Sequence, residues 1–161
     1  MTHKNTEQST SRFWEAKQLS EMTRDEWEKV CDGCGRCCLL KAEDEDTGEI
    51  HLTRLACRLL DRVSCRCGDY ANRRTHVPDC IALTLTDVAT LSWLPPTCGY
   101  RRLKEGRGLA WWHPLVSGTH QTVHDAGISV QGQCIAETEK RVEAMEDFIV
   151  APWPADTDAA A

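Results

Sequence analysis

Apolar and polar residues follow a helical spacing in two short stretches near the start of the chain. Residues 11–20 contain three large apolar side chains at the spacing of a short amphipathic helix. Residues 23–26 have the residue types of a capping box, and Trp27 and Val30 then share one face of a second predicted helix. We expect this second helix to end at Cys31.

Shorter alternating segments predict strands between the helices. Residues 49–53 alternate like a short β-strand, and they follow an acidic turn at residues 43–48. Residues 127–130 have the pattern of another short strand. The sequence therefore predicts a mixture of helices and short strands.

Two further helices are expected in the second half of the chain. A helix over Thr86–Leu94 would be capped by its first threonine and stopped by the two prolines that follow it. Residues 134–150 have the most helix-like spacing of apolar residues in the chain. Without repeats or Gly/Ser-rich linkers, we predict one domain over residues 12–150, a disordered N-terminus at 1–11 and a flexible tail at 151–161.

Cysteine is the unusual feature of the composition, with ten residues in a chain of 161. A disulfide scaffold would need an oxidising compartment and hence export. Residues 1–24 are polar and charged, without the apolar segment of a signal peptide, and no stretch approaches the ~20 apolar residues of a membrane span. We therefore expect a cytosolic protein with no membrane partner, in which clustered cysteines are ligands or redox groups.

Basic residues gather in the middle of the chain, where residues 51–110 hold 10 of the 19 Lys and Arg residues. Clustered arginine can neutralise the phosphates of a nucleic acid. Arginine can equally stabilise the net negative charge of four thiolates around a divalent ion. We prefer this local compensation, and we do not expect a nucleic-acid partner.

The strongest motif is the run Cys31-x2-Cys34-x2-Cys37, which is followed directly by Cys38. A spacing of two residues lets one turn present two sulfur atoms to one ion, as in zinc ribbons and iron–sulfur proteins. Side chains of neighbouring residues diverge, so Cys37 and Cys38 are not expected to serve one tetrahedral site identically. Either two metal centres share this loop, or one of the two thiols is a spare.

Downstream cysteines can supply the remaining ligands. Eight thiolates could fill two closed four-ligand sites, or one multi-iron cluster with thiols left over. Cys134 is the weakest candidate, and we expect it to be a small buried residue. The predicted metal ligands are Cys31, Cys34, Cys37, Cys38, Cys57, Cys65, Cys67, Cys80 and Cys98.

Sulfur ligands exclude magnesium and calcium as the main ions, because both prefer hard oxygen ligands. Zinc binds a simple thiolate site more tightly than ferrous iron does, whereas a preassembled iron–sulfur cluster avoids that competition. The expected cofactor is therefore Zn²⁺ or Fe, either as an ion or as an Fe–S cluster. The predicted fold class is α+β, a small, helix-rich, irregular single domain organised around a cysteine-ligated metal centre.

Histidine could complete such a metal shell, since imidazole is a common zinc and iron ligand. Each histidine on its own is more often a surface or hydrogen-bonded residue. His76, four residues before Cys80, is the best of the candidates. The candidates are His51, His76, His113, His120 and His124.

The run from Cys31 to Cys38 resembles the signature of the CxxCxxCC, or YkgJ-like, cysteine-cluster family, whose members are described as chelating zinc or iron. Segments around Cys57, Cys67 and Cys80 resemble later elements of that pattern, whereas Cys65 lies outside it. The YcgN-like branch is more similar and covers residues 12–130. The motifs shared with that branch include Trp14, Pro78-Asp79-Cys80, Trp93-Leu94-Pro95, Thr97-Cys98 and Trp112-His113-Pro114-Leu115.

This resemblance implies a cytosolic metal-binding protein that chelates zinc or iron through clustered thiolates. The alternative is an iron–sulfur protein acting in electron transfer or as part of a modifying enzyme, since one relative of the family, flagellin lysine methylase, combines such a domain with an iron–sulfur centre. The chain has no nucleotide-binding or nucleophile motif, so we do not expect an enzyme acting on its own. The sequence indicates neither a protein partner nor a biological process.

Overall fold

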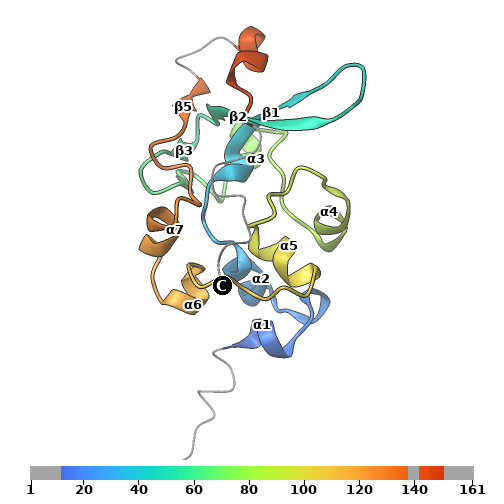
Figure 1. Ribbon diagram of the computed structural model, residues 1–161, viewed down its shortest axis with the longest axis vertical. Helices are drawn as coiled ribbons and strands as arrows, with labels where there is room; N and C mark the ends of the chain where they lie inside the picture. The colour runs from blue at the N-terminus through green and yellow to red at the C-terminus, as the bar shows by residue number, and fades with distance from the viewer. Residues whose placement is uncertain (1–11, 138–141, 151–161) are drawn as a thin grey trace, which may run out of the picture.

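The computed structural model describes residues 12–137 and 142–150 (Figure 1). The predictions for residues 1–11 and 151–161 lie outside these residues. The α-helices described are α1 (Phe13–Ala16), α2 (Arg24–Val30), α3 (Arg73–His76), α4 (Leu85–Thr90), α5 (Gly99–Lys104), α6 (Pro114–Ser117) and α7 (Gln121–Asp125), with 3₁₀ helices η1 (Leu19–Glu21), η2 (Arg36–Cys38) and η4 (Val142–Phe148). The strands described are β1 (Leu39–Glu43), β2 (Ile50–Ala56), β3 (Leu60–Asp61), β4 (Arg66–Cys67) and β5 (Ile135–Ala136). The predicted α+β class is confirmed.

Helix α2 begins where the capping box predicts it. The Thr23 hydroxyl accepts a hydrogen bond from the Glu26 backbone N–H at 3.2 Å, and the Glu26 carboxylate accepts one from the Thr23 N–H at 3.0 Å. These two bonds satisfy backbone donors that an isolated helix start would leave free. The helix ends at Val30, which is fully buried, and Cys31 is its C-cap residue.

A β-hairpin follows the cysteine motif. Strand β1 pairs antiparallel with β2, from Leu39 opposite Ala56 to Glu43 opposite Ile50. The acidic turn between them is confirmed, because the Asp44 carboxylate accepts hydrogen bonds from two backbone N–H groups within the turn. Strand β5 adds to the other edge of β2 in parallel, which completes a three-stranded sheet.

Three of the predicted elements are wrong or displaced. The capping residue of α4 is Thr84 rather than Thr86, because its hydroxyl accepts from the Asp87 N–H, and the helix ends at Thr90. Residues 127–130 form no strand and follow α7 as irregular chain. The helix predicted over 134–150 is replaced by strand β5 and the 3₁₀ helix η4, and residues 138–141 within it lie outside the described part.

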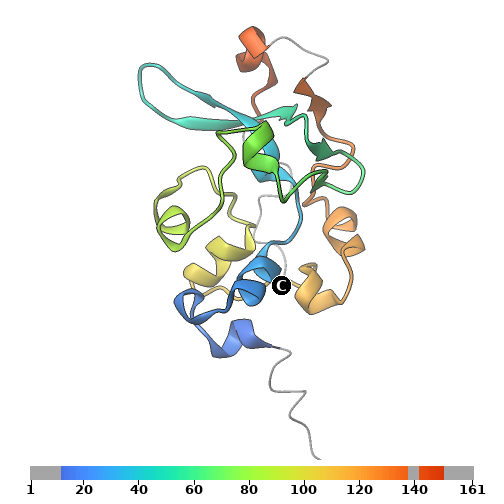
Figure 2. The same ribbon diagram turned by 180° about the vertical axis from the view of Figure 1, so that it is seen from behind.

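The cysteine motif runs through the middle of the molecule. Figures 1 and 2 show the segment from α2 to β1 passing between α4 and α5 on one side and α6 and α7 on the other. Three buried hydrophobic clusters meet along it, because Val30 belongs to the first, Cys34 to another and Leu39 to a third. The sequence motif is thus also the junction of the core. Among the described residues, no helix combines the length and apolar character needed to cross a membrane.

Candidate metal centre

The backbone of the motif sends its two adjacent thiols in different directions. Gly35 has φ +80, a left-handed conformation that favours glycine, and a Cβ there would lie 2.8 Å from a methyl carbon of Val130. The chain then turns into η2, in which Cys38 donates its N–H to the Gly35 carbonyl at 3.0 Å. A 3₁₀ helix has three residues per turn, so Cys37 and Cys38 point about one third of a turn apart.

Four cysteines form what we call the first thiol group: Cys31, Cys34, Cys37 and Cys98. The Asp32 carboxylate connects their segments, because it accepts hydrogen bonds from the Cys34 N–H at 3.0 Å and the Gly99 N–H at 3.3 Å. Gly99 also approaches the end of α2 so closely that a Cβ on it would collide with the Val30 carbonyl oxygen. Cys98 is therefore held beside Cys31, although 67 residues separate them in the sequence.

Burial and mutual repulsion disfavour the ionised form of these thiols. Burial is the largest cause, and with the Asp32 charge it raises the pKa of Cys31 to about 11 and that of Cys98 to about 12. The pKa of Cys37 is raised well above the ordinary thiol value by burial and then by Cys98 and Cys31. Solvent still reaches Cys31 and Cys37, whereas Cys34 and Cys98 are buried.

Two buried polar side chains brace the first thiol group. Arg36 is fully buried, and its guanidinium donates to the Ile128 carbonyl at 3.0 Å and to the Thr97 hydroxyl at 3.2 Å, next to Cys98. His113 is also fully buried, with Nδ1 accepting from the Leu115 N–H at 3.0 Å. Its Nε2 then carries the proton and donates to the Val30 carbonyl at 2.9 Å. Both ring nitrogens of His113 are thus used in holding the fold.

Four other cysteines form the second thiol group: Cys38, Cys57, Cys67 and Cys80. Backbone hydrogen bonds bring three of their segments together, since Cys57 donates its N–H to the Cys38 carbonyl at 2.8 Å and Cys67 pairs with Leu60 across β3 and β4. The Leu59 N–H donates to the Cys57 sulfur at 3.5 Å, a contact that stabilises a thiolate.

The electrostatics of Cys38 identify the remaining members of the second thiol group. Burial raises the pKa of Cys38 to about 12, and the next causes are the thiols of Cys57, Cys67 and Cys80. A nearby like charge disfavours the ionised form of a thiol and raises its pKa. This electrostatic interaction is the ground for including Cys80, whose N–H closes a turn with the Val77 carbonyl at 2.9 Å.

Lys41 lies beside cysteines of both groups. Its ammonium donates to the Cys37 and Leu39 carbonyls, each at 2.9 Å, and lies 4.2 Å from the centroid of the Trp93 ring. Burial lowers the pKa of Lys41, while nearby cysteines of both groups, Cys37 first and Cys38 next, raise it. Lys41 therefore places one cation at the backbone of the motif, in electrostatic interaction with cysteines of both groups.

Cys65 and Cys134 share a hydrophobic cluster with Cys38, one of the second thiol group, but they are not among the causes of its pKa shift. Cys65 has φ +62, the one positive φ of a non-glycine residue among those described. Its sulfur interacts with the Ser129 hydroxyl and the backbone N–H groups of Val130 and Gln131, and burial raises its pKa. Burial raises the pKa of Cys134, and the charge of Cys65 is the next cause of this shift.

The histidine candidates bond to partners other than cysteine. His76, the best candidate from sequence, faces the Asp69 carboxylate at 3.1 Å. His124 bonds the Ser129 hydroxyl at 2.7 Å, and His120 contacts the Arg66 guanidinium. His51 lies 3.8 Å from the Glu49 carboxylate. These contacts give each histidine a role without a metal.

Within residues 12–137 and 142–150, no group of three or more Cys, His, Asp or Glu side chains already has the geometry to hold a metal ion. The donor chemistry nevertheless fits zinc or iron, because both thiol groups offer four sulfur atoms with amide or ammonium donors beside them. The set of nine cysteine ligands therefore stays a prediction.

Comparison with known proteins places the chain in a family. Residues 30–99 match the family model CxxCxxCC, described as "Putative zinc- or iron-chelating domain". The chain is also 61% identical over 144 residues to a UPF0260 protein of Rhodopseudomonas palustris (strain HaA2), covering 89% of this chain and 84% of that protein. The chain belongs to the UPF0260 family. The predicted resemblance to the CxxCxxCC family is confirmed.

Other UPF0260 proteins match over a similar length. The protein of Rhizobium etli (strain CIAT 652) is 57% identical over 142 residues, covering 88% of this chain and 89% of that protein. The protein of Parvibaculum lavamentivorans is 56% identical over 142 residues, covering 88% of this chain and 92% of that protein. No solved structure matches the UPF0260 chain.

Sequence reasoning missed three residues that shape this site of the UPF0260 chain. Asp32 and Lys41 both form hydrogen bonds with the backbone of the motif. Their charge and their position within two or three residues of a predicted ligand could have indicated this role from the sequence. Gly99 had a weaker signal, because a glycine directly after Cys98 suggests close approach to other backbone.

Proposed function

We propose that this protein is a cytosolic metal-binding protein that chelates zinc or iron through clustered cysteine thiolates. One observation carries the proposal: hydrogen bonds hold segments with distant cysteines against the central motif. The Cys57 N–H donates to the Cys38 carbonyl at 2.8 Å, and the Gly99 N–H, next to Cys98, donates to the Asp32 carboxylate at 3.3 Å. Thiols that lie near one another disfavour each other's ionised forms when no cation is bound. A bound cation would remove the penalty.

Thiolate chemistry explains how such a site would work. A metal ion binds the deprotonated sulfur, so binding releases the thiol protons and draws the sulfur atoms together. Neighbouring amide donors, such as the Leu59 N–H on Cys57, would then stabilise the charge on the sulfur. Zinc or iron bound in this way would stabilise the fold around it.

Iron–sulfur chemistry is the alternative use of the same ligands. Fe–S clusters are held by cysteine thiolates, and their potentials are tuned by hydrogen bonds to sulfur of the kind found at Cys57. A cluster would make an electron-transfer protein or a component of a modifying enzyme. Zinc would make the centre redox-silent.

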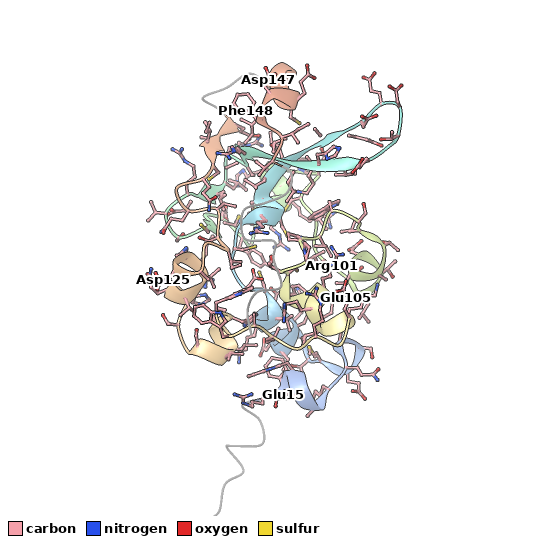
Figure 3. The ribbon with its side chains drawn as sticks, in the orientation of Figure 1. Glu15, Arg101, Glu105, Asp125, Asp147 and Phe148 are labelled. Carbon is pink, nitrogen blue, oxygen red and sulfur yellow. The ribbon has the colours of Figure 1, made fainter. Side chains whose placement is uncertain are left out.

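Three arginines of the basic middle segment have partners within the protein. Arg101 pairs with Glu105 on α5 at 2.8 Å, as labelled in Figure 3, and donates to the Leu94 carbonyl at 2.5 Å. Arg102 donates to the Gly108 carbonyl at 2.9 Å, and Arg107 donates to that of Pro96 at 2.7 Å. These guanidinium groups bind the protein itself.

Elemental analysis and an absorption spectrum of anaerobically purified protein test the proposed function. We expect bound zinc with no visible colour, or bound iron with charge-transfer bands in the visible range. Iron together with acid-labile sulfide would assign the cluster alternative. Protein that is folded, fully reduced and free of both metals would contradict the proposal.

A further inference from the structure

We propose that Arg66 and His120 bind a carboxylate group of a small-molecule metal complex beside the cysteine motif, and that the ion of this complex then passes to Cys31. This inference rests on the proposed function and goes beyond it by naming the chemical class of the metal donor.

Arg66 and His120 contact each other directly over the cysteine motif. One terminal nitrogen of the Arg66 guanidinium lies 2.9 Å from Nδ1 and 2.6 Å from Nε2 of the His120 ring. A Cβ built on Gly33 would lie 3.8 Å from that Nδ1 and 4.0 Å from the same Arg66 nitrogen. Gly33 stands between Cys31 and Cys34, so both side chains lie against the loop that carries these thiols.

The β3–β4 hairpin fixes the position of Arg66. Arg66 is the first residue of β4 and lies opposite Asp61 of β3. The Asp61 carboxylate accepts hydrogen bonds from the backbone N–H groups of Val63 at 2.8 Å and Ser64 at 3.1 Å. The acidic residue across the hairpin from Arg66 is therefore used within the turn.

The charge around the pair is positive. Burial lowers the pKa of His120, and the charges of Arg66, His113 and His124 lower it further. No carboxylate of the residues that the structure describes is among these causes. Arg107, by contrast, lies 2.7 Å from a glutamate carboxylate. An exposed site with a positive field attracts anions.

The chemistry of Arg66 favours a carboxylate as that anion. A guanidinium is charged at any ordinary pH, and its five N–H donors form a fork that matches the two oxygens of a carboxylate. The contact with His120 engages one guanidinium nitrogen, so donors remain for a ligand. Both side chains are exposed, so a small molecule can reach them.

Cys31 is the thiol that would receive the ion. Solvent reaches Cys31, whereas Cys34 on the other side of Gly33 is buried. Zinc and iron prefer thiolate to carboxylate ligands, so transfer from the donor to the motif is favourable. In each exchange a metal–oxygen bond breaks and a metal–sulfur bond forms. The thiol proton leaves to solvent, and the carboxylate is released as an anion.

Protection from chemical modification tests the site in the purified full-length chain. Succinate is the probe, because it carries carboxylates but holds metal ions weakly. It should slow the reaction of Arg66 with phenylglyoxal and that of His120 with diethyl pyrocarbonate several-fold, as measured by mass spectrometry of peptides. Arg54 and His76 are exposed controls in the same sample and should react at unchanged rates. Equal rates for Arg66 with and without succinate, or protection by inorganic phosphate alone, would overturn the inference.

Transfer kinetics test the role of the site. Co²⁺ is offered to the reduced, metal-free chain either as its anionic citrate complex or as the hydrated ion, and the thiolate-to-cobalt absorption band is followed. Arg66→Gln should slow transfer from the citrate complex about 5-fold, near the upper end for one exposed ion pair. It should not slow binding of the hydrated cation, which Arg66 repels. Arg54→Gln removes the same charge elsewhere and should match the wild type with both donors. The ratio of the two rates is compared, so that any shared loss of folded chain cancels.

The outcomes separate this inference from the proposed function. If Arg66→Gln slows both forms of cobalt equally, the charge of Arg66 acts on Cys31 rather than on the donor, and the inference is overturned. Absence of any thiolate-to-cobalt band in the wild type would contradict the proposed function. The protection experiment would then still decide whether Arg66 and His120 bind a carboxylate.

Discussion

Lys41 makes three kinds of contact at the cysteine motif. Its ammonium donates to two carbonyls of the motif, lies over the Trp93 ring and interacts with cysteines of both thiol groups. Burial lowers the pKa of Lys41, and the nearby cysteines act in the opposite direction. The side chain would thus link the backbone of the motif to the charge of a metal bound there.

Replacing Lys41 by methionine should weaken metal binding. The variant keeps the apolar stem against Trp93 but removes the positive charge, and loss of such an outer partner lowers metal affinity about 10–100-fold. Competition with a chelator of known affinity measures the change. Lys104→Met is the matched control, because Lys104 donates only to the Ala89 carbonyl at 3.3 Å at the surface. Equal affinities for the two variants would contradict the role of Lys41.

At the residue scale, the sequence predicts the side-chain directions within the motif but not the contacts that the motif makes with residues distant in the sequence. The different directions of Cys37 and Cys38 follow from their adjacency alone. The residues that surround each of these two thiols cannot be predicted from adjacency. Cys98, for example, lies near Cys31 because Gly99 packs against Val30, and no rule of sequence spacing predicts that contact. The sequence likewise shows Asp32 within the motif, but it does not predict that the Asp32 carboxylate accepts hydrogen bonds from both Cys34 and Gly99.

Among the elements, α2 and α5 make the contact that positions the first thiol group. The Gly99 N–H bonds Asp32, and its Cα lies directly against the Val30 carbonyl. His113 donates to that same carbonyl at 2.9 Å. Any side chain at position 99 must therefore push two helices apart, and Cys98 moves with the second of them.

Gly99→Ala should destabilise the protein strongly. A backbone oxygen cannot rotate away from the added methyl group as a side chain could, so we expect a loss near the upper end of the overpacking range, about 3 kcal/mol. Thermal unfolding of the metal-loaded chain measures it. Gly106→Ala is the control, since Gly106 has φ +73 with open space around it, and the cost there should be about 1 kcal/mol. Equal costs would show that the close contact is not rigid.

The elements that sequence predicts best are those with local signals. The capping box fixed the start of α2, and the acidic residues fixed the turn of the hairpin. The helix predicted over 134–150 failed because both of its ends pair with one strand. Ile135 lies opposite Leu55, and the Val150 N–H donates to the Leu52 carbonyl at 2.9 Å. A helix of that length would be about 24 Å long and could not return to the same strand.

On the scale of the whole molecule, the core is divided into three clusters that meet at the cysteine motif. Residues 30–39 contribute to all of them, so the motif is both the candidate site and the connection between the parts of the core. A metal bound there would hold these parts together. Folding and metal binding should therefore be coupled.

Removing the metal should partly unfold the protein. A structural zinc site contributes about 10–16 kcal/mol in small peptides, which is comparable to the whole stability of about 5–15 kcal/mol of a domain. Treatment with a chelator, followed by thermal unfolding and small-angle scattering, checks this. A chelated chain that keeps its full melting temperature and its compactness would show that the metal is peripheral.

Metal binding should also release protons and strengthen as the pH rises. The pKa values of about 11 for Cys31 and about 12 for Cys38 keep these thiols protonated at neutral pH in the absence of metal. The bound ion requires thiolates, so the metal-bound state carries fewer protons and its affinity falls as the pH falls. Addition of Zn²⁺ in weak buffer should release roughly four protons per ion. Binding with no proton release would contradict thiolate ligation.

X-ray absorption at the edge of the metal that the purified protein carries tests the central claim most directly. Sulfur atoms from distant parts of the chain are expected to surround one ion, so the first shell should consist of about four sulfur atoms, at about 2.3 Å for zinc. A first shell made of nitrogen and oxygen atoms, with no sulfur contribution, would contradict the account.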